Sequence, residues 1–124
     1  DSYIASRQRA AAFYDNAFAG NPHLLIPTRS ADSTHVFHQY TLRLIDVDRD
    51  ALRNALAEKG IPAMVYYPIP LHMQKAYQDP RYQTGDFPVA EKLADCVLSL
   101  PMHTELDEEQ LTYICNHVLA FVNQ

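Results

Sequence analysis

The segment VYYPIPLH holds the chain's densest group of side chains that could contact a ligand. Tyr66 and Tyr67 end a short apolar run with two phenols, and a phenol both donates and accepts hydrogen bonds. Pro68 and Pro70 stiffen the backbone that follows, so His72 projects from it at little further entropic cost. Because neighbouring strand side chains point to opposite faces, at least one tyrosine should line a cleft or an interface. The segment alone leaves both a binding surface and ordinary edge packing open.

Six histidines and two cysteines raise the question of a metal site. His35 and His38 are three residues apart, but a strand at this position would place them on opposite faces. Zinc also needs a third ligand within reach, and Cys96 and Cys115 match no zinc or redox spacing. We therefore predict no metal site, and we expect His35 and His38 to form local hydrogen bonds where a loop meets a strand.

Other common catalytic arrangements are missing from the sequence. It contains no glycine-rich loop of the dinucleotide-binding or P-loop kind that would hold a phosphate. Ser99 lies in LSLP without a neighbouring glycine, so the sharp turn that exposes a nucleophilic serine would be strained. Lys59, Lys75 and Lys92 are best interpreted as solvated charges. The sequence therefore predicts neither a phosphate-binding loop nor a nucleophilic serine.

The 124 residues are 48% hydrophobic and 20% charged, which fits one globular domain and excludes an intrinsically disordered chain. No apolar run approaches the roughly 18–20 residues of a membrane span. The formal net charge of -5 argues against nucleic acid as a principal partner, since phosphates would be repelled. Two cysteines are too few for a disulfide framework, so we expect reduced thiols in a cytoplasmic protein. The first residues already follow a helical rhythm, and we expect the chain to be part of a longer one.

Periodicity divides the chain into alternating helices and strands. The first helix should stop at Gly20, which adopts the left-handed conformation of a helix end easily. The apolar period then changes to two, and one covered face of a strand is expected to hold Val36, His38, Tyr40, Leu42 and Leu44. The expected elements are helix 2–19, loop 21–34, strand 36–45, a helix within 46–60, strand 63–67, an irregular stretch 68–87 with a short helix near 73–77, helix 87–95, strand 96–101 and helix 107–122.

The ends of these elements and their connections indicate the fold. Asp46 or Asp48 can cap the second helix, and Asp107 and Gln110 have the spacing of a capping box at the last one. The connections are too short for parallel crossovers throughout. We therefore predict an α/β domain of the two-layer α+β kind, in which helices pack on one face of a small, mostly antiparallel, three-stranded sheet.

Three stretches resemble the C-terminal segment of nucleotide-sugar aminotransferases of the DegT/StrS type: VFHQYTLRL, RDALRNALAEKGIPAMVYYPIPLHMQKAY and FPVAEKLADCVLSLPMHTELDEEQLTYI. The resemblance runs from about Val36 to Ile114, with the motifs in the family's order and spacing. The leading helix, residues 1–20, is similar to the family's inter-domain region, and residues 36–122 are similar to its α/β core. The resemblance implies that residues 1–124 form a single domain, the small C-terminal domain of a larger enzyme.

The resemblance carries expectations about the whole protein. Members of the family are pyridoxal-phosphate enzymes of the aspartate aminotransferase fold (fold type I), with a large cofactor-binding domain and a small C-terminal domain. They are homodimers whose active sites lie at the subunit interface. They transfer an amino group, usually from glutamate, to a keto-sugar carried by a nucleoside diphosphate. The resemblance thus implies a role in making lipopolysaccharide, another surface polysaccharide or an antibiotic amino sugar.

Because only the small domain is matched, the lysine that forms the Schiff base and the residues that hold pyridoxal phosphate would belong to a preceding domain. The chain alone is therefore expected to be inactive and to contribute substrate recognition. The positions that match the family's tyrosine–proline loop are Tyr66 and Tyr67, with His72 as a further candidate. Relatives that act on uronic-acid sugars carry His-Tyr where this chain has Tyr66-Tyr67, which leaves the sugar open.

Two other interpretations stay open at this point. The chain could be a non-catalytic binding or regulatory domain of the same fold, and the presence or absence of a Schiff-base lysine upstream would decide between the two roles. It could also be a free-standing interaction module that dimerises through apolar surface which a large domain would otherwise cover.

Overall fold

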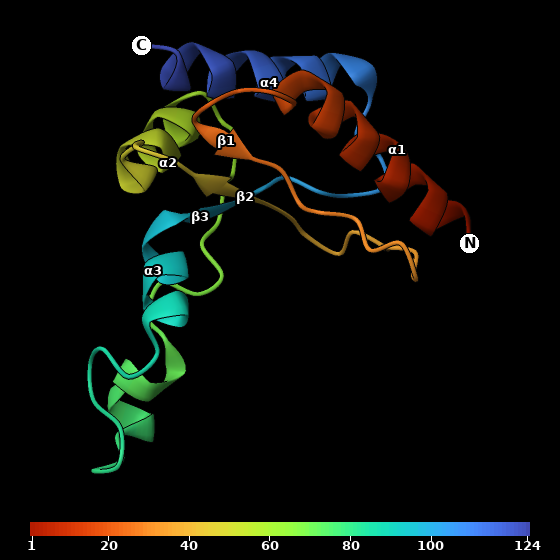
Figure 1. Ribbon diagram of the computed structural model, residues 1–124. Helices are drawn as coiled ribbons and strands as arrows, with labels where there is room; N and C mark the ends of the chain where they lie inside the picture. Colours follow the sequence, from red (N-terminus) through yellow and green to blue (C-terminus); the bar gives the residue numbers. More distant parts are fainter.

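Four α-helices and three short strands make up the computed structural model, which describes residues 1–124 (Figure 1). The antiparallel sheet and its helices confirm the predicted α/β class. None of the helices is long and apolar enough to cross a membrane. In chain order the elements, with η for single turns of 3₁₀-helix, are α1 (Ser2–Phe18), β1 (Leu24–Leu25), β2 (Tyr40–Leu44), α2 (Arg49–Glu58), η1 (Leu71–Met73), η2 (Lys75–Tyr77), α3 (Pro88–Cys96), β3 (Val97–Leu100) and α4 (Glu108–Val122).

The sheet has the order β1-β2-β3, and both neighbouring pairs are antiparallel. The predicted strand 63–67 is wrong as a strand, because only Met64 pairs with the sheet, through a single bridge to Ser99 of β3. Pro68 and Pro70 lack the N–H groups that a longer ladder would need. The chain therefore leaves the sheet directly after the bridge.

Strand β1 lies inside the stretch predicted as loop 21–34. Only Leu24 and Leu25 pair, and Leu24 stands opposite Leu44 of β2. Two residues are too few to show an alternating pattern in a sequence. Their strand conformation results from pairing with β2, a contact between segments that are distant in the chain.

Strand β2 begins later than its predicted start at Val36. Phe37 has a positive φ of 49° and a buried side chain, so the backbone turns at this point and the alternation starts anew. As a result Val36 and His38 are exposed, whereas the buried face holds Tyr40, Leu42 and Leu44, as predicted. The N–H of Phe37 donates to Nδ1 of His35 at 2.9 Å, which is the local hydrogen bond expected of that histidine.

Helices α2 and α4 begin at predicted caps. Of the two candidates for α2, Asp48 is the cap, and its side chain accepts a hydrogen bond from the N–H of Ala51 at 2.9 Å. At α4 the carboxylate of Asp107 accepts from the N–H of Gln110 at 2.8 Å, and the side chain of Gln110 accepts from the N–H of Asp107 at 3.2 Å. These caps give partners to N–H groups that the first helical turn leaves free.

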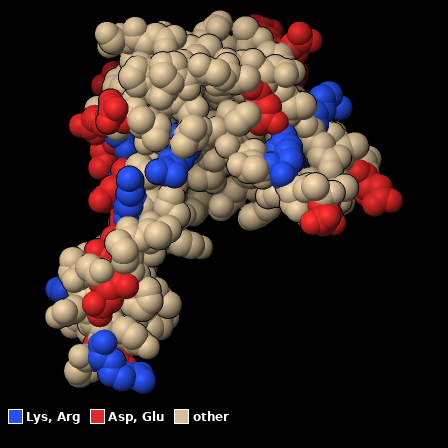
Figure 2. All heavy atoms as spheres, in the orientation of Figure 1, with Lys and Arg blue, Asp and Glu red and all other residues tan.

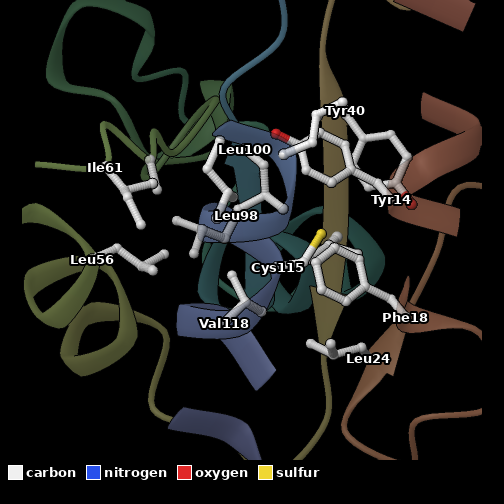
Figure 3. Packing of buried hydrophobic residues seen from close by; sticks show 14 of the residues in the cluster. Tyr14, Phe18, Leu24, Tyr40, Leu56, Ile61, Leu98, Leu100, Cys115 and Val118 are labelled. Carbon is white, nitrogen blue, oxygen red and sulfur yellow. The ribbon is translucent and has the colours of Figure 1, made fainter. Parts of the chain in front are cut away.

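Helices α1, α2 and α4 cover one face of the sheet and enclose one apolar cluster (Figures 1 and 3). The rings of Tyr14 and Phe18 in α1 stack with centroids 5.9 Å apart, and Tyr40 of β2 packs 4.8 Å from Tyr14. The Tyr14 hydroxyl donates to the carbonyl of Pro101 at 2.8 Å, and the Tyr40 hydroxyl donates to Asp15 at 2.8 Å. Both buried phenols thus keep a hydrogen bond, which removes the main cost of enclosing them.

Helix α3 departs from the prediction that all helices pack on one face. It lies below the sheet in Figure 1, away from α1, α2 and α4, and it borders a groove with Thr41 of β2. Nη1 of Arg49 donates to the carbonyl of Ala94 at 2.7 Å and so ties α3 to α2. Residues 66–93 extend from this junction, and we call them the arm. Figure 2 shows the arm as a separate lobe that carries both acidic and basic side chains on its visible face.

Replacing Leu42, a fully buried residue of the central strand, by alanine should lower the free energy of unfolding by about 2–5 kcal/mol, because the lost side chain leaves a cavity. The same change at the exposed Leu71 of the arm is a matched control and should alter stability by less than about 0.5 kcal/mol. Urea denaturation followed by circular dichroism measures both. Equal effects at the two positions would contradict the assignment of the core.

The two free thiols should react at different rates. Burial raises the pKa of the Cys115 thiol to about 12, so little reactive thiolate forms at pH 8, whereas Cys96 is only half-buried. Brief treatment of the native protein with iodoacetamide, followed by peptide mass mapping, should modify Cys96 first. In urea the two labelling rates should become similar. Faster labelling of Cys115 in the native protein would show that α4 does not pack on the sheet as described.

Candidate functional site

Tyr66 and Tyr67 line a groove of about 680 Å³. Its other lining residues come from the rest of the arm, from α3 and from strands β2 and β3. Nine of the twelve residues that line the groove are hydrophobic, a composition typical of sites for small molecules. Tyr66 is 41% exposed and Tyr67 is 73% exposed. Their rings meet edge to face with centroids 5.9 Å apart, and the peptide bond between them is cis. Both phenols therefore belong to the groove and neither to the core.

The sheet determines where the tyrosines lie. The N–H of Met64 donates to the carbonyl of Ser99 at 2.9 Å, and the N–H of Ser99 donates back to the carbonyl of Met64 at 2.8 Å. This bridge holds the chain two residues before Tyr66. Beyond the tyrosines the two prolines restrict the backbone, and the side-chain amide of Gln74 donates to the carbonyl of Ile69 at 3.1 Å. The segment that carries the phenols is thus fixed on both sides.

The polar groups of the groove are few. Oγ1 of Thr41 lies 2.7 Å from Oγ of the buried Ser99, so this hydroxyl already has a partner. None of the hydrogen bonds within the chain involves the hydroxyl of Tyr66 or Tyr67. Each phenol is therefore available to donate to a phosphate oxygen of a ligand, and to donate to or accept from a ligand hydroxyl.

His72 does not join the two tyrosines. Its side chain is only 9% exposed, and it lines hollows on the outer part of the arm rather than the groove of Tyr66 and Tyr67. Nε2 lies 2.9 Å from Oε1 of Glu91, and the ring packs 4.8 Å from the ring of Phe87. The structure thus brings together two of the three site residues that the sequence indicated.

Glu91 is a residue that the sequence analysis missed. Its carboxylate accepts from the N–H of Gly85 at 2.8 Å and from the N–H of Phe87 at 3.4 Å, besides its contact with His72. The Gly85 N–H, with smaller contributions from His72 and Phe87, holds the pKa of this carboxyl below its ordinary value, and partial desolvation opposes the shift. Its place in the first turn of a helix that begins with Pro88 was the available signal, since acidic groups there face free N–H groups.

The groove does not contain the groups that would hold pyridoxal phosphate covalently. Lys59, Lys75 and Lys92 are all exposed, and none of them lines the groove. No group of three or more histidine, cysteine, aspartate or glutamate side chains is placed to hold a metal ion. The residues present can therefore recognise a ligand through phenols and apolar contacts, but they do not fit a Schiff-base site.

Residues 1–119 match the DegT/DnrJ/EryC1/StrS aminotransferase family. Over 123 residues the chain is 41% identical to the "Pleiotropic regulatory protein" of Geobacillus stearothermophilus, covering 98% of this chain and 32% of that protein. Over 113 residues it is 46% identical to the UDP-N-acetyl-3-dehydro-alpha-D-glucosamine 3-aminotransferase of Acidithiobacillus ferrooxidans, covering 91% of this chain and 29% of that protein. The chain thus spans about a third of the length of these relatives.

The fold also matches solved structures. The crystal structure of S. venezuelae DesV in complex with a ketimine intermediate superposes with a TM-score of 0.93 at 33% sequence identity. The match covers 100% of this chain and 33% of that chain. The resemblance inferred from the sequence motifs is therefore confirmed, and the chain belongs to the DegT/DnrJ/EryC1/StrS aminotransferase family.

Proposed function

We propose that the protein containing this chain is a pyridoxal-phosphate-dependent aminotransferase that transfers an amino group, with glutamate as donor, to a nucleotide-linked keto-sugar. One observation supports assigning substrate binding to this chain and cofactor binding to residues outside it. The groove presents the free phenols of Tyr66 and Tyr67 but no lysine. In this proposal residues 1–124 are the small C-terminal domain, with 1–20 as inter-domain helix and 36–122 as α/β core. The 124 residues alone are inactive. The complete protein is a cytoplasmic homodimer that serves surface-polysaccharide or amino-sugar biosynthesis.

The residues of this chain act on the substrate by binding it. The hydroxyls of Tyr66 and Tyr67 hydrogen-bond to hydroxyl or phosphate oxygens of the nucleotide sugar, and the apolar wall of the groove excludes water from that contact. A hydrogen bond from a hydroxyl is directional, so each phenol contributes to the orientation of the sugar. Pyridoxal phosphate, held by residues outside this chain, supplies the electron sink for amino transfer. His72 supports the same site through its contact with Glu91 at the outer part of the arm.

A second candidate function is a non-catalytic regulatory role. It is favoured by the name of the Geobacillus stearothermophilus relative, which is 41% identical over nearly the whole chain and is called a pleiotropic regulatory protein. The two functions differ in one chemical feature of the complete protein. An aminotransferase needs a lysine that binds the cofactor covalently, whereas a regulator of the same fold does not.

In the protein encoded by the complete reading frame, Tyr66→Phe and Tyr67→Phe should each raise the KM for the nucleotide keto-sugar by about two- to tenfold, because each removes one hydrogen bond. Tyr3→Phe, an exposed tyrosine of α1 that does not line the groove, is the matched control and should leave KM unchanged. Steady-state kinetics with varied sugar measure all three. Unchanged KM and kcat in both groove variants would remove these tyrosines from the substrate site.

Borohydride reduction decides between the aminotransferase and the regulator. The reagent converts an imine between pyridoxal phosphate and a lysine into a stable amine, so an aminotransferase should gain the mass of one pyridoxyl phosphate per chain. Peptide mapping should place the adduct on a lysine outside Asp1–Gln124, and an unreduced sample is the control. Absence of any adduct after incubation with pyridoxal phosphate would support the regulatory role.

A further inference from the structure

The carboxylate of Glu91 accepts hydrogen bonds from three residues of the arm. It accepts from the N–H of Gly85 at 2.8 and 3.1 Å through its two oxygens, and from the N–H of Phe87 at 3.4 Å. Nε2 of His72 lies 2.9 Å from Oε1. The side chains of His72 and Glu91 are only 9% and 19% exposed, so solvent competes weakly for these contacts. The carboxylate therefore joins both ends of the stretch between His72 and Phe87 to helix α3.

The stretch 71–87 has no other long-range hydrogen bonds. Its two single turns of 3₁₀-helix and its loop are closed by bonds that reach no farther than five residues along the chain, such as Gln74 to Ile69 and Arg81 to Asp79. Local bonds of this kind define turns but do not fix a turn relative to the rest of a domain. The hydrogen bonds to Glu91 are therefore the polar contacts that orient this stretch relative to α3.

The position of this stretch matters for the groove. Leu71, Gln74 and Tyr77 line the same groove as Tyr66 and Tyr67 and come from the part of the chain that Glu91 holds. Helices α1, α2 and α4 with the sheet form the part of the domain that we call the body. Helix α3 is attached to this body, because Ala94 is buried and its carbonyl accepts a hydrogen bond from Arg49. A continuous set of contacts thus runs from α2 through α3 and Glu91 to one wall of the groove.

We infer that Glu91 is a positioning residue for the substrate site, with His72 as its partner. It acts by holding Leu71, Gln74 and Tyr77 in the groove that the two tyrosines also line. The inference rests on the proposed function in that it names the ligand of the groove as a nucleotide sugar. It goes beyond that function because it assigns a role to a residue that does not line the groove.

The test uses Glu91→Ala and Glu91→Gln in the protein encoded by the complete reading frame. Alanine removes every acceptor, whereas glutamine keeps one oxygen for the N–H groups of Gly85 and Phe87. The first readout is amide hydrogen exchange of peptides that cover residues 79–87, which needs no activity. In Glu91→Ala these amides should exchange about tenfold faster or more, since bonds to a charged acceptor are lost, while peptides of α1 and α4 stay unchanged. Glu91→Gln should restore part of the protection.

The second readout is a split between KM and kcat for the nucleotide keto-sugar. Glu91→Ala should raise KM about tenfold and leave kcat within about twofold, with partial recovery in Glu91→Gln. Glu108→Ala, an exposed glutamate in the first turn of α4, is the control and should change neither readout. Unchanged exchange at residues 79–87, or faster exchange without a change in KM, would overturn the positioning role. A wild-type protein without activity on any nucleotide sugar would instead refute the proposed function, and the exchange data would still decide whether Glu91 holds the arm.

Discussion

The single bridge between Met64 and Ser99 is the constraint on which the candidate site depends. It joins the chain to the edge strand β3 by two short backbone hydrogen bonds, and the prolines that follow cannot extend the ladder. The chain therefore leaves the sheet with Tyr66 and Tyr67 at its edge. The side chain of the same Ser99 pairs with Thr41 of β2, another residue of the groove. One residue thus connects the central strand, the bridge and the site, so a shift of β3 would move all three together.

Different interactions stabilise the body and the arm. The body encloses one apolar cluster drawn from α1, α2, α4 and the sheet, and its buried phenols are paired with the carbonyl of Pro101 and with Asp15. The arm has many exposed apolar side chains, local hydrogen bonds and one carboxylate, Glu91, that ties its outer part to α3. Stability is therefore concentrated in the body, while the arm depends on a few polar contacts.

The chain matches only part of the length of its relatives, and no lysine lines its groove. The chain corresponds to about a third of each relative, so most of the residues of a complete enzyme lie outside it. Within this third, two phenols lie among apolar side chains in the groove, and no lysine lines it. The relatives named above include both an aminotransferase and a regulatory protein. A shared small domain is compatible with both roles, because function is determined by particular side chains rather than by the fold.

The sequence by itself determined the helices, their caps and the family. Asp48, Asp107 and Gln110 act through neighbours within one helical turn, so local spacing was enough to predict them. The sequence also predicted that at least one of Tyr66 and Tyr67 lines a cleft or an interface, and in the structure both line the groove. Only the tertiary structure decided that Leu24–Leu25 forms a strand, that Met64 alone pairs after α2, and that His72 contacts Glu91 rather than the groove. Each of these contacts joins residues that are 18 or more positions apart in the chain, and a local sequence pattern cannot report such a contact.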